Sequence, residues 1–248
     1  MATILITGAT SGIGEALAKR CVNDGHKVIA CGRNEEKLAE LAKIENMTTC
    51  RFDVTDEAAT KDALANVKCD IAVLNAGTCE YVDINNIEPD MFKRVFDANV
   101  FGVVNVVSAL IPVLKSGNKI VFVDSLARLL PFPKSQAYGA SKAALNYIAK
   151  SFEVDLAHKG IAVQTLSPGF VKTPLTDKND FPMPMVISAE EAAEYMLKGI
   201  VSSRASVYFP RRFSFIVRLL NLLPERVQKK ICISMRQKPK KKENARND

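Results

Sequence analysis

The chain has 248 residues, of which 48% are apolar and 25% charged, so it is long enough for one large α/β domain with a well-filled core. Its six cysteines form no CxxC pair and it has only two histidines, which argues against a zinc site and favours a reduced, cytoplasmic protein. The apolar run at the N-terminus is too short for a signal peptide, and no run of about 18 uncharged apolar residues predicts a membrane-spanning helix.

The net charge of +7 is unevenly distributed. From Arg204 onward there are 13 Lys and Arg residues against 3 Asp and Glu residues, which leaves a net charge of −3 on the residues before it. A basic body would suggest nucleic acid as a partner, and this body is mildly acidic. No nucleic-acid partner is therefore expected, and the basic charge belongs to a C-terminal extension.

Strand-like and helix-like segments alternate along the chain. Short apolar runs predict strands over residues 3–7, 26–32, 48–54, 70–77, 119–125, 161–169 and 206–210. Helical patterns fall between them, over residues 13–25, 34–44, from 55 or 56 onward, 89–115, 136–159 and 188–202. Asn34 is a candidate N-cap for the second helix. A proline-containing loop is predicted over residues 168–187.

This alternation predicts an α/β fold, because each strand–helix–strand unit makes a right-handed crossover between parallel strands. Residues 1–210 are therefore expected to form a single doubly wound, Rossmann-type parallel sheet with helices on both faces. Such sheets bind ligands beyond the carboxyl ends of their strands. Residues 211–248 form a separate basic, amphipathic C-terminal extension.

A glycine-rich loop, TGATSGIG over residues 7–14, follows the first strand and opens the first helix. Gly8, Gly12 and Gly14 lack side chains, so the backbone can approach a pyrophosphate at the positive end of the helix. The alternative is a turn in which the glycines serve only tight strand–helix packing. Its position at the first strand–helix junction favours dinucleotide binding.

A tyrosine and a lysine, Tyr138 and Lys142, lie one helical turn apart in the segment SQAYGASKAAL. A free phenol has a pKa near ~10, and a neighbouring ammonium is expected to lower it by stabilising the phenolate. The pair would then be a usable proton donor and acceptor at neutral pH. The alternative is an ordinary helix surface with a cation near a tyrosine.

The glycine loop, the segment Asn75-Ala76-Gly77, Ser125 and the Tyr138–Lys142 pair together resemble the short-chain dehydrogenase/reductases, in the subtype of about 250 residues. The resemblance covers roughly residues 1–210. It implies an NAD(P)-dependent oxidoreductase that interconverts a carbonyl and a secondary alcohol. In that family pattern, Tyr138 passes the proton, Lys142 tunes it and holds the nicotinamide ribose, and Ser125 bonds the substrate oxygen. Asn99 would hold a water that links Lys142 to solvent, or would only kink its helix.

The cofactor preference depends on the end of the second strand, where an acidic residue would bind a ribose 2′-hydroxyl. Arg33 lies there instead, and the resemblance assigns it to the 2′-phosphate of NADP(H), which is favoured over NAD(H). Alternatively Arg33 is solvated and pairs with Glu35 or Glu36. Asp53 resembles the family's acceptor for the adenine amine. The resemblance implies that the cofactor also contacts Gly8, Thr10, Ser11, Gly12, Ile13, Gly14, Val54, Asn75, Ala76, Gly77, Tyr138, Lys142, Pro168, Gly169, Val171 and Thr173.

The predicted function is therefore NADP(H)-dependent oxidation and reduction of a small-molecule alcohol or carbonyl, without a metal. The alternatives are an NAD-dependent dehydrogenase of the same family and a non-catalytic dinucleotide-binding regulator. Arg128 and Lys134 depart from the family pattern, and either recognise an anionic substrate or are solvated or paired with acids. The resemblance also implies a homodimer or homotetramer, through the helices at 89–115 and 136–159.

The C-terminal extension predicts an amphipathic helix from residue 211, because eight apolar residues fill a wide face between Phe213 and Leu223. Pro224 is expected to begin a second helical segment, and the lysine-rich end is expected to be disordered. Residues 211–242 either lie in a membrane interface, with their cations on anionic lipid, or pack on the domain. Both alternatives place apolar surface near the 168–187 loop and favour an apolar substrate.

Overall fold

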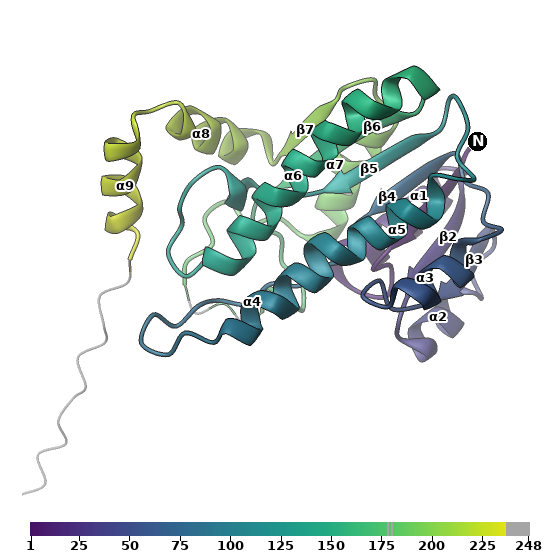
Figure 1. Cartoon of the computed structure of the whole chain (residues 1–248), viewed down its shortest axis with the longest axis horizontal. Coiled ribbons are helices and arrows are strands. Elements are labelled where there is room, and N and C mark those ends of the chain that lie inside the picture. The colour runs from purple at the N-terminus through teal and green to yellow at the C-terminus, as the bar shows by residue number, and fades with distance from the viewer. Residues whose placement is uncertain (178, 180, 237–248) are drawn as a thin grey trace, which may run out of the picture.

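All seven predicted strands form one parallel sheet in the computed structural model, which describes residues 1–177, 179 and 181–236 (Figure 1). The spatial order is β3-β2-β1-β4-β5-β6-β7, so it reverses between β1 and β4. The strands are β1 (Thr3–Thr7), β2 (Lys27–Gly32), β3 (Met47–Arg51), β4 (Ile71–Leu74), β5 (Lys119–Val123), β6 (Ala162–Pro168) and β7 (Ser206–Phe209). The predicted doubly wound fold is thus confirmed.

Helices connect the strands and cover both faces of the sheet (Figure 1). They are α1 (Gly12–Asn23), α2 (Glu35–Leu41), α3 (Glu57–Leu64), α4 (Pro89–Phe96), α5 (Gly102–Leu110), α6 (Gln136–Leu156), α7 (Ala189–Ile200), α8 (Arg211–Asn221) and α9 (Glu225–Ser234). Asn34 caps α2 as predicted, because its side chain accepts a hydrogen bond from the backbone of Lys37.

Two apolar layers hold the helices on the sheet. On one face, side chains of α1 and α7 such as Leu17 and Met196 pack against β1 and β6. On the other face, side chains of α5 and α6 such as Val106 and Leu145 pack against β4 and β5. Because apolar residues point to both faces of the central strands, the strands read as nearly continuous apolar runs.

The predicted long helix at 89–115 is interrupted. A π-helical turn, Asp97–Phe101, separates α4 from α5, and α5 already ends at Leu110. Such turns insert extra residues into a helix and often occur at functional sites. Here the turn places the side chain of Asn99 in the interior, where it is fully buried.

The C-terminal extension forms α8 and α9, which lie beyond the β7 edge of the sheet, at the opposite end of the view from the N-terminus (Figure 1). Pro224 precedes α9 as its N-cap residue, as predicted. The lysine-rich end that was expected to be disordered lies outside the described residues. Within the described residues, no helix combines the length and the apolar character that crossing a membrane requires.

Candidate active site

The glycine loop between β1 and α1 adopts a conformation that requires glycine. Gly8 has a φ of +67°, and a Cβ there would lie 2.9 Å from the Cα of Ala76. A Cβ on Gly14 would lie 2.1 Å from the carbonyl oxygen of Gly8. The N-cap residue Ser11 makes no side-chain capping bond, so it leaves the first-turn N–H groups of α1 to another acceptor. This cradle fits the pyrophosphate of a dinucleotide.

The segment Asn75–Gly77 is tied to the end of β1 beside this loop. The hydroxyl of Thr7 accepts hydrogen bonds from the backbone N–H groups of Asn75 and Ala76, both at 3.0 Å. The side-chain amide of Asn75 donates to the carbonyl of Thr7 at 3.1 Å. Asn75 therefore bridges two neighbouring strands at the point where the strand order reverses.

Arg33 and Asp53 form an ion pair beyond the ends of β2 and β3, with 3.1 Å between Nη1 and Oδ2. Arg33 thus pairs with Asp53 rather than with the alternative partners Glu35 and Glu36, and Glu35 pairs with Arg51. Burial opposes ionisation of Asp53, but hydrogen bonds from Thr55 and the Arg33 guanidinium hold its pKa below the usual value. The exposed guanidinium of Arg33 remains available to an anion at this edge.

Ser125, Tyr138 and Lys142 are brought together where β5 ends and α6 begins. The Ser125 hydroxyl accepts a bond from the backbone of Ala127 at 3.1 Å and donates to the carbonyl of Pro168 at 3.5 Å. The ammonium of Lys142 donates to the carbonyl of Val123 at 2.9 Å and lies 5.9 Å from the centre of the Tyr138 ring. A phenol, a hydroxyl and a cation therefore lie together at the carboxyl end of β5.

The pKa of Tyr138 differs in direction from the prediction. Burial and the neighbouring Cys79 thiol raise the pKa of Tyr138, while the nearby Ser125 hydroxyl opposes this shift. Burial also lowers the pKa of Lys142 to about 8, and Asp124 and Cys79 partly offset that shift. The prediction that Lys142 lowers the pKa of Tyr138 is wrong for the protein alone, because burial dominates the shift and the Lys142 ammonium donates to the Val123 carbonyl. Tyr138 is thus protonated at neutral pH.

Asn99 lies next to this group and is held on both sides. Its side-chain oxygen accepts from the backbone of Thr78 at 2.7 Å, and its amide donates to the Thr78 carbonyl at 2.9 Å and to the Ser141 hydroxyl at 3.0 Å. A Cβ on Gly77 would lie 2.7 Å from Asn99 Oδ1 and 3.5 Å from Lys142 Nζ. Asn99 therefore fixes the 77–78 segment beside the Lys142 ammonium.

The segment after β6 begins next to Ser125, whose hydroxyl donates to the carbonyl of Pro168. Gly169 donates its N–H to the carbonyl of Phe209 at 2.7 Å. Val171 is buried and makes a parallel bridge with Ile187, and the backbone of Thr173 donates to the Thr176 hydroxyl at 2.9 Å. A Cβ on Gly12 would lie 3.3 Å from Thr173, so this segment and the glycine loop meet.

Arg128 does not face the cleft as a free cation. Its Nε donates to Asp124 at 2.7 Å, in an ion pair whose side chains are 10% and 0% exposed. Asn146 donates to the same carboxylate oxygen at 2.7 Å, and Tyr208 bonds and stacks with the guanidinium. Of the two alternatives for Arg128, the structure therefore shows pairing with an acid.

Four aromatic rings form a row whose arrangement the sequence did not indicate. Tyr81 and Cys79 are both close enough to Tyr138 for electrostatic interaction. The ring centre of Tyr81 lies 5.1 Å from that of Phe181. Phe181 lies 6.2 Å from Phe170, and Phe170 lies 5.4 Å from Phe213 of α8. The available signal was the position of three of these rings after Gly77 and after Gly169, but the four rings come from three separate segments.

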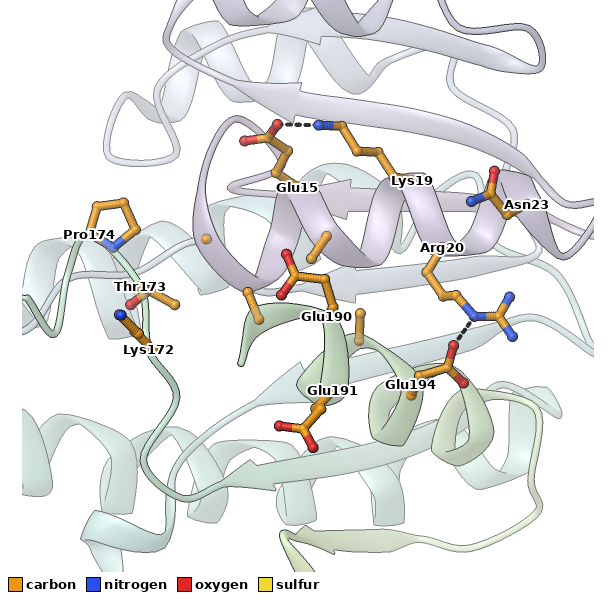
Figure 2. Close-up of a pocket in the computed structure, with 14 residues that line it drawn as sticks. Glu15, Lys19, Arg20, Asn23, Lys172, Thr173, Pro174, Glu190, Glu191 and Glu194 are labelled. Carbon is orange, nitrogen blue, oxygen red and sulfur yellow. Dashed lines mark hydrogen bonds and ion pairs between the residues drawn. The ribbon is translucent and has the colours of Figure 1, made fainter. Parts of the chain in front are cut away.

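A depression lies between α1 and the N-terminal half of α7 (Figure 2). It measures about 600 Å³ and borders the glycine loop at Gly12. Half of its lining residues are charged, and ion pairs join Lys19 to Glu15 and Arg20 to Glu194 (Figure 2). Tyr138 is not among its lining residues, so this depression is separate from the group of Ser125, Tyr138 and Lys142.

The sequence pattern of the short chain dehydrogenase family matches residues 2–182. The chain therefore belongs to the short-chain dehydrogenase/reductases, and it is an NAD(P)-dependent oxidoreductase that acts on CH–OH groups. Among the described residues, no group of three or more His, Cys, Asp or Glu side chains is arranged to hold a metal ion.

Similar proteins include an uncharacterized oxidoreductase of Myxococcus xanthus, 35% identical over 90% of this chain and 92% of the relative. The serine 3-dehydrogenase of Agrobacterium fabrum is 34% identical over 80% of this chain and 81% of its own. A 3beta-hydroxysteroid dehydrogenase of Mediterraneibacter gnavus is 36% identical over 71% of this chain and 68% of its own. The closed form of a serine dehydrogenase complexed with NADP+ superposes with a TM-score of 0.77, at 26% identity over 84% of this chain and 94% of that one.

Proposed function

We propose that the protein is an NADP(H)-dependent oxidoreductase that interconverts a ketone or aldehyde and the corresponding alcohol of an apolar substrate, with Tyr138 as the acid and base. The observation that carries this proposal is the proximity of Tyr138 to both Ser125 and Lys142, with the ring of Tyr81 also close to Tyr138.

In the proposed reaction, the bound nicotinamide supplies or accepts the hydride. The Ser125 hydroxyl donates a hydrogen bond to the substrate oxygen as negative charge develops on it. Tyr138 gives its proton to that oxygen during reduction and takes it back during oxidation. Lys142 stabilises the phenolate through its positive charge. Because burial raises its pKa, Tyr138 is protonated before the cofactor binds, and this is the form that reduction requires.

NADP(H) is proposed as the cofactor because Arg33 projects a guanidinium from the end of β2, where a 2′-phosphate would lie. The solved serine dehydrogenase similar to this chain is complexed with NADP+, which supports the same cofactor here. The ion pair with Asp53 keeps Arg33 at this edge of the sheet. A phosphate would then share the guanidinium with, or displace, the Asp53 carboxylate.

An apolar substrate is proposed because the cleft is bordered by the rings of Tyr81, Phe170, Phe181 and Phe213. Rings in this arrangement offer apolar area but few charged partners. The named relatives act on substrates as different as serine and a steroid, so the family alone does not decide the substrate. The ring row favours the steroid-like end of this range.

A homo-oligomer is also proposed, formed through α4, α5 and α6. Phe101 of the π-helical turn between α4 and α5 is 59% exposed, and Tyr147 and Val154 of α6 are 77% and 75% exposed. Large exposed apolar side chains on neighbouring helices are typical of subunit contacts. Light scattering of the purified protein would give its mass, and a monomer would contradict this part of the proposal.

The catalytic assignment is tested with Tyr138→Phe in an assay of ketone reduction by NADPH. The variant keeps the ring but loses the proton, so we expect kcat/KM to fall by at least about 100-fold. Binding of NADPH, measured by its fluorescence, should remain within about twofold and serves as the control for folding. Wild-type activity in Tyr138→Phe would refute the role of Tyr138.

The cofactor assignment is tested with Arg33→Ala, with Arg51→Ala as a matched control on the neighbouring strand. Loss of a charged hydrogen-bond donor to phosphate should raise the KM for NADPH by at least about tenfold, and change that for NADH little. Arg51 pairs with Glu35 and should leave both values unchanged. Equal effects of Arg33→Ala on both cofactors would favour the NAD-dependent alternative.

A further inference from the structure

Helix α8 is apolar on two opposite sides. One side lies on the domain, where Val217 is buried together with Leu126 and Leu130 and where Phe213 and Leu220 add partly buried contacts. On the opposite side, Phe215, Leu219 and Leu222 are 67%, 53% and 80% exposed. We call these three residues the outer face of α8. An amphipathic helix packed on its own domain normally exposes mainly polar residues, and this one exposes these large apolar side chains beside its arginines.

Cations surround the outer face, and almost no acids do. Residues 211–236 contain seven Arg and Lys residues and one acid, Glu225. Arg211, Arg212, Lys229 and Lys230 are exposed, and none of the ion pairs between described residues involves them. In sequence, this excess of positive charge continues through the lysines at 238–242. An apolar strip bordered by unpaired cations matches a bilayer interface with anionic headgroups.

A groove of about 470 Å³ adjoins the N-terminal end of α8. It is lined by Met185, Val186 and Phe213, with Arg211 and Arg212 also on its wall. Met185 and Val186 are themselves exposed. Two guanidiniums beside an apolar depression provide what a lipid phosphate and the start of its acyl chains require.

We propose that the outer face of α8, with the adjoining groove, docks on an anionic lipid bilayer. A second copy of this chain is the other candidate occupant, and charge argues against it. A two-fold contact through α8 would bring two surfaces together that each have seven cations and one acid between residues 211 and 236, which is repulsive at close range. The helix thus contacts the domain with one side and the membrane with the other.

The proposal is tested by sedimenting the full-length protein with vesicles. Wild-type protein should bind vesicles of phosphatidylcholine with a third phosphatidylglycerol and should bind pure phosphatidylcholine weakly, and 0.5 M salt should weaken binding to the anionic vesicles. The double variant Phe215→Ser/Leu219→Ser should lose at least about tenfold in partitioning, since each side chain contributes apolar burial. Reduction of a water-soluble ketone should be unchanged in this variant, which controls for folding.

Ile84→Ser/Ile87→Ser is the matched control, because these residues are 63% and 54% exposed but lie on the loop before α4. This control should sediment like wild type. Equal binding by wild type and the α8 variant would overturn the proposal. So would equal wild-type binding to anionic and neutral vesicles, because the cations would then have no role. A change of oligomeric state in the α8 variant, without vesicle binding by wild type, would assign the face to a second copy.

Discussion

Lys142 is a cation that the fold holds in the interior, with 5% of its surface exposed. Its ammonium is buried, and its pKa falls from 10.5 to about 8. A lowered pKa on a base means that the folded protein disfavours the protonated form. Burial of the Lys142 ammonium therefore lowers the free energy of unfolding by its full amount below pH 8. This penalty shrinks as the pH rises from 8 to 10.5 and is absent above 10.5.

Lys142→Met removes this pH dependence. Relative to the variant, cofactor-free wild-type protein should gain about 3 kcal/mol of unfolding free energy between pH 7 and pH 10.5, from the size of the pKa shift. Urea unfolding of both proteins across this range measures the difference. The variant also leaves the Val123 carbonyl without its 2.9 Å donor, but that cost is the same at every pH. A constant difference would show that Lys142 is not desolvated.

The rate of ketone reduction should also depend on the protonation of Lys142, but it should change with pH in the direction opposite to stability. Lys142 stabilises the phenolate that forms when Tyr138 gives up its proton, and this requires the ammonium form. Ketone reduction should therefore fall as the pH rises through about 8, the pKa of Lys142. Initial rates at saturating NADPH between pH 6 and pH 10 give the profile. A rate that rises through this range would contradict the assigned role.

The ion pair between Asp124 and Arg128 could not be predicted from the residues that surround them in the sequence. Arg128 stood out as a departure from the family pattern, and both a substrate contact and an ion pair were open. The choice depends on Asn146 and Tyr208, which approach from α6 and β7. Nothing local to residues 124–128 indicates these neighbours.

At the scale of elements, the junction between β1 and α1 is the tightest part of the fold. Gly14→Ala would place a methyl group 2.1 Å from the carbonyl oxygen of Gly8. Neither β1 nor α1 can shift far enough to relieve this contact. We expect a loss of at least about 3 kcal/mol in unfolding free energy, together with weaker dinucleotide binding.

Gly117→Ala is the matched control for this change. Gly117 has a positive φ of 92°, but a Cβ there would meet nothing within 4 Å. Only backbone strain of about 1 kcal/mol is then expected. Thermal or urea unfolding of both variants gives the comparison. Similar losses for the two would show that steric contact at Gly14 is not the reason for its glycine.

The strands and most helices were predictable because their apolar periodicity is strong, as in the runs that became β1 and β5. The interruption between α4 and α5 was not, because a π-helical turn changes the helix by a single residue and leaves the apolar pattern intact. The ends of β3 and β4 were placed too late, because the motif residues 52–54 and 75–77 follow these strands directly but lie beyond the last paired residues, Arg51 and Leu74.

At the scale of the whole molecule, the motifs predicted which residues gather in the cleft, but not the environment they create there. The four rings of the aromatic row come from the loop after β4, the segment after β6 and α8, and only the tertiary fold aligns them. The raised pKa of Tyr138 has the same origin, because its causes include Cys79 from a distant loop. Spacing between motif residues contains no information on such burial.

The row of aromatic rings also connects the proposed catalytic residues with the helix that is proposed to bind lipid. It begins at Tyr81 near Tyr138 and ends at Phe213, on the helix whose outer face is proposed to meet lipid. If lipid binding at Phe213 orders the row of rings, and a ligand bound near Tyr81 orders the same row, then the two binding events are coupled. The coupling free energy must be reciprocal.

Anionic vesicles should then lower the Kd of an apolar ligand, and that ligand should raise vesicle affinity by the same factor. Titration calorimetry in both orders measures the two factors, and unequal factors or no change would exclude the coupling. The enzyme would then turn over apolar substrates fastest at the surface where such molecules are concentrated.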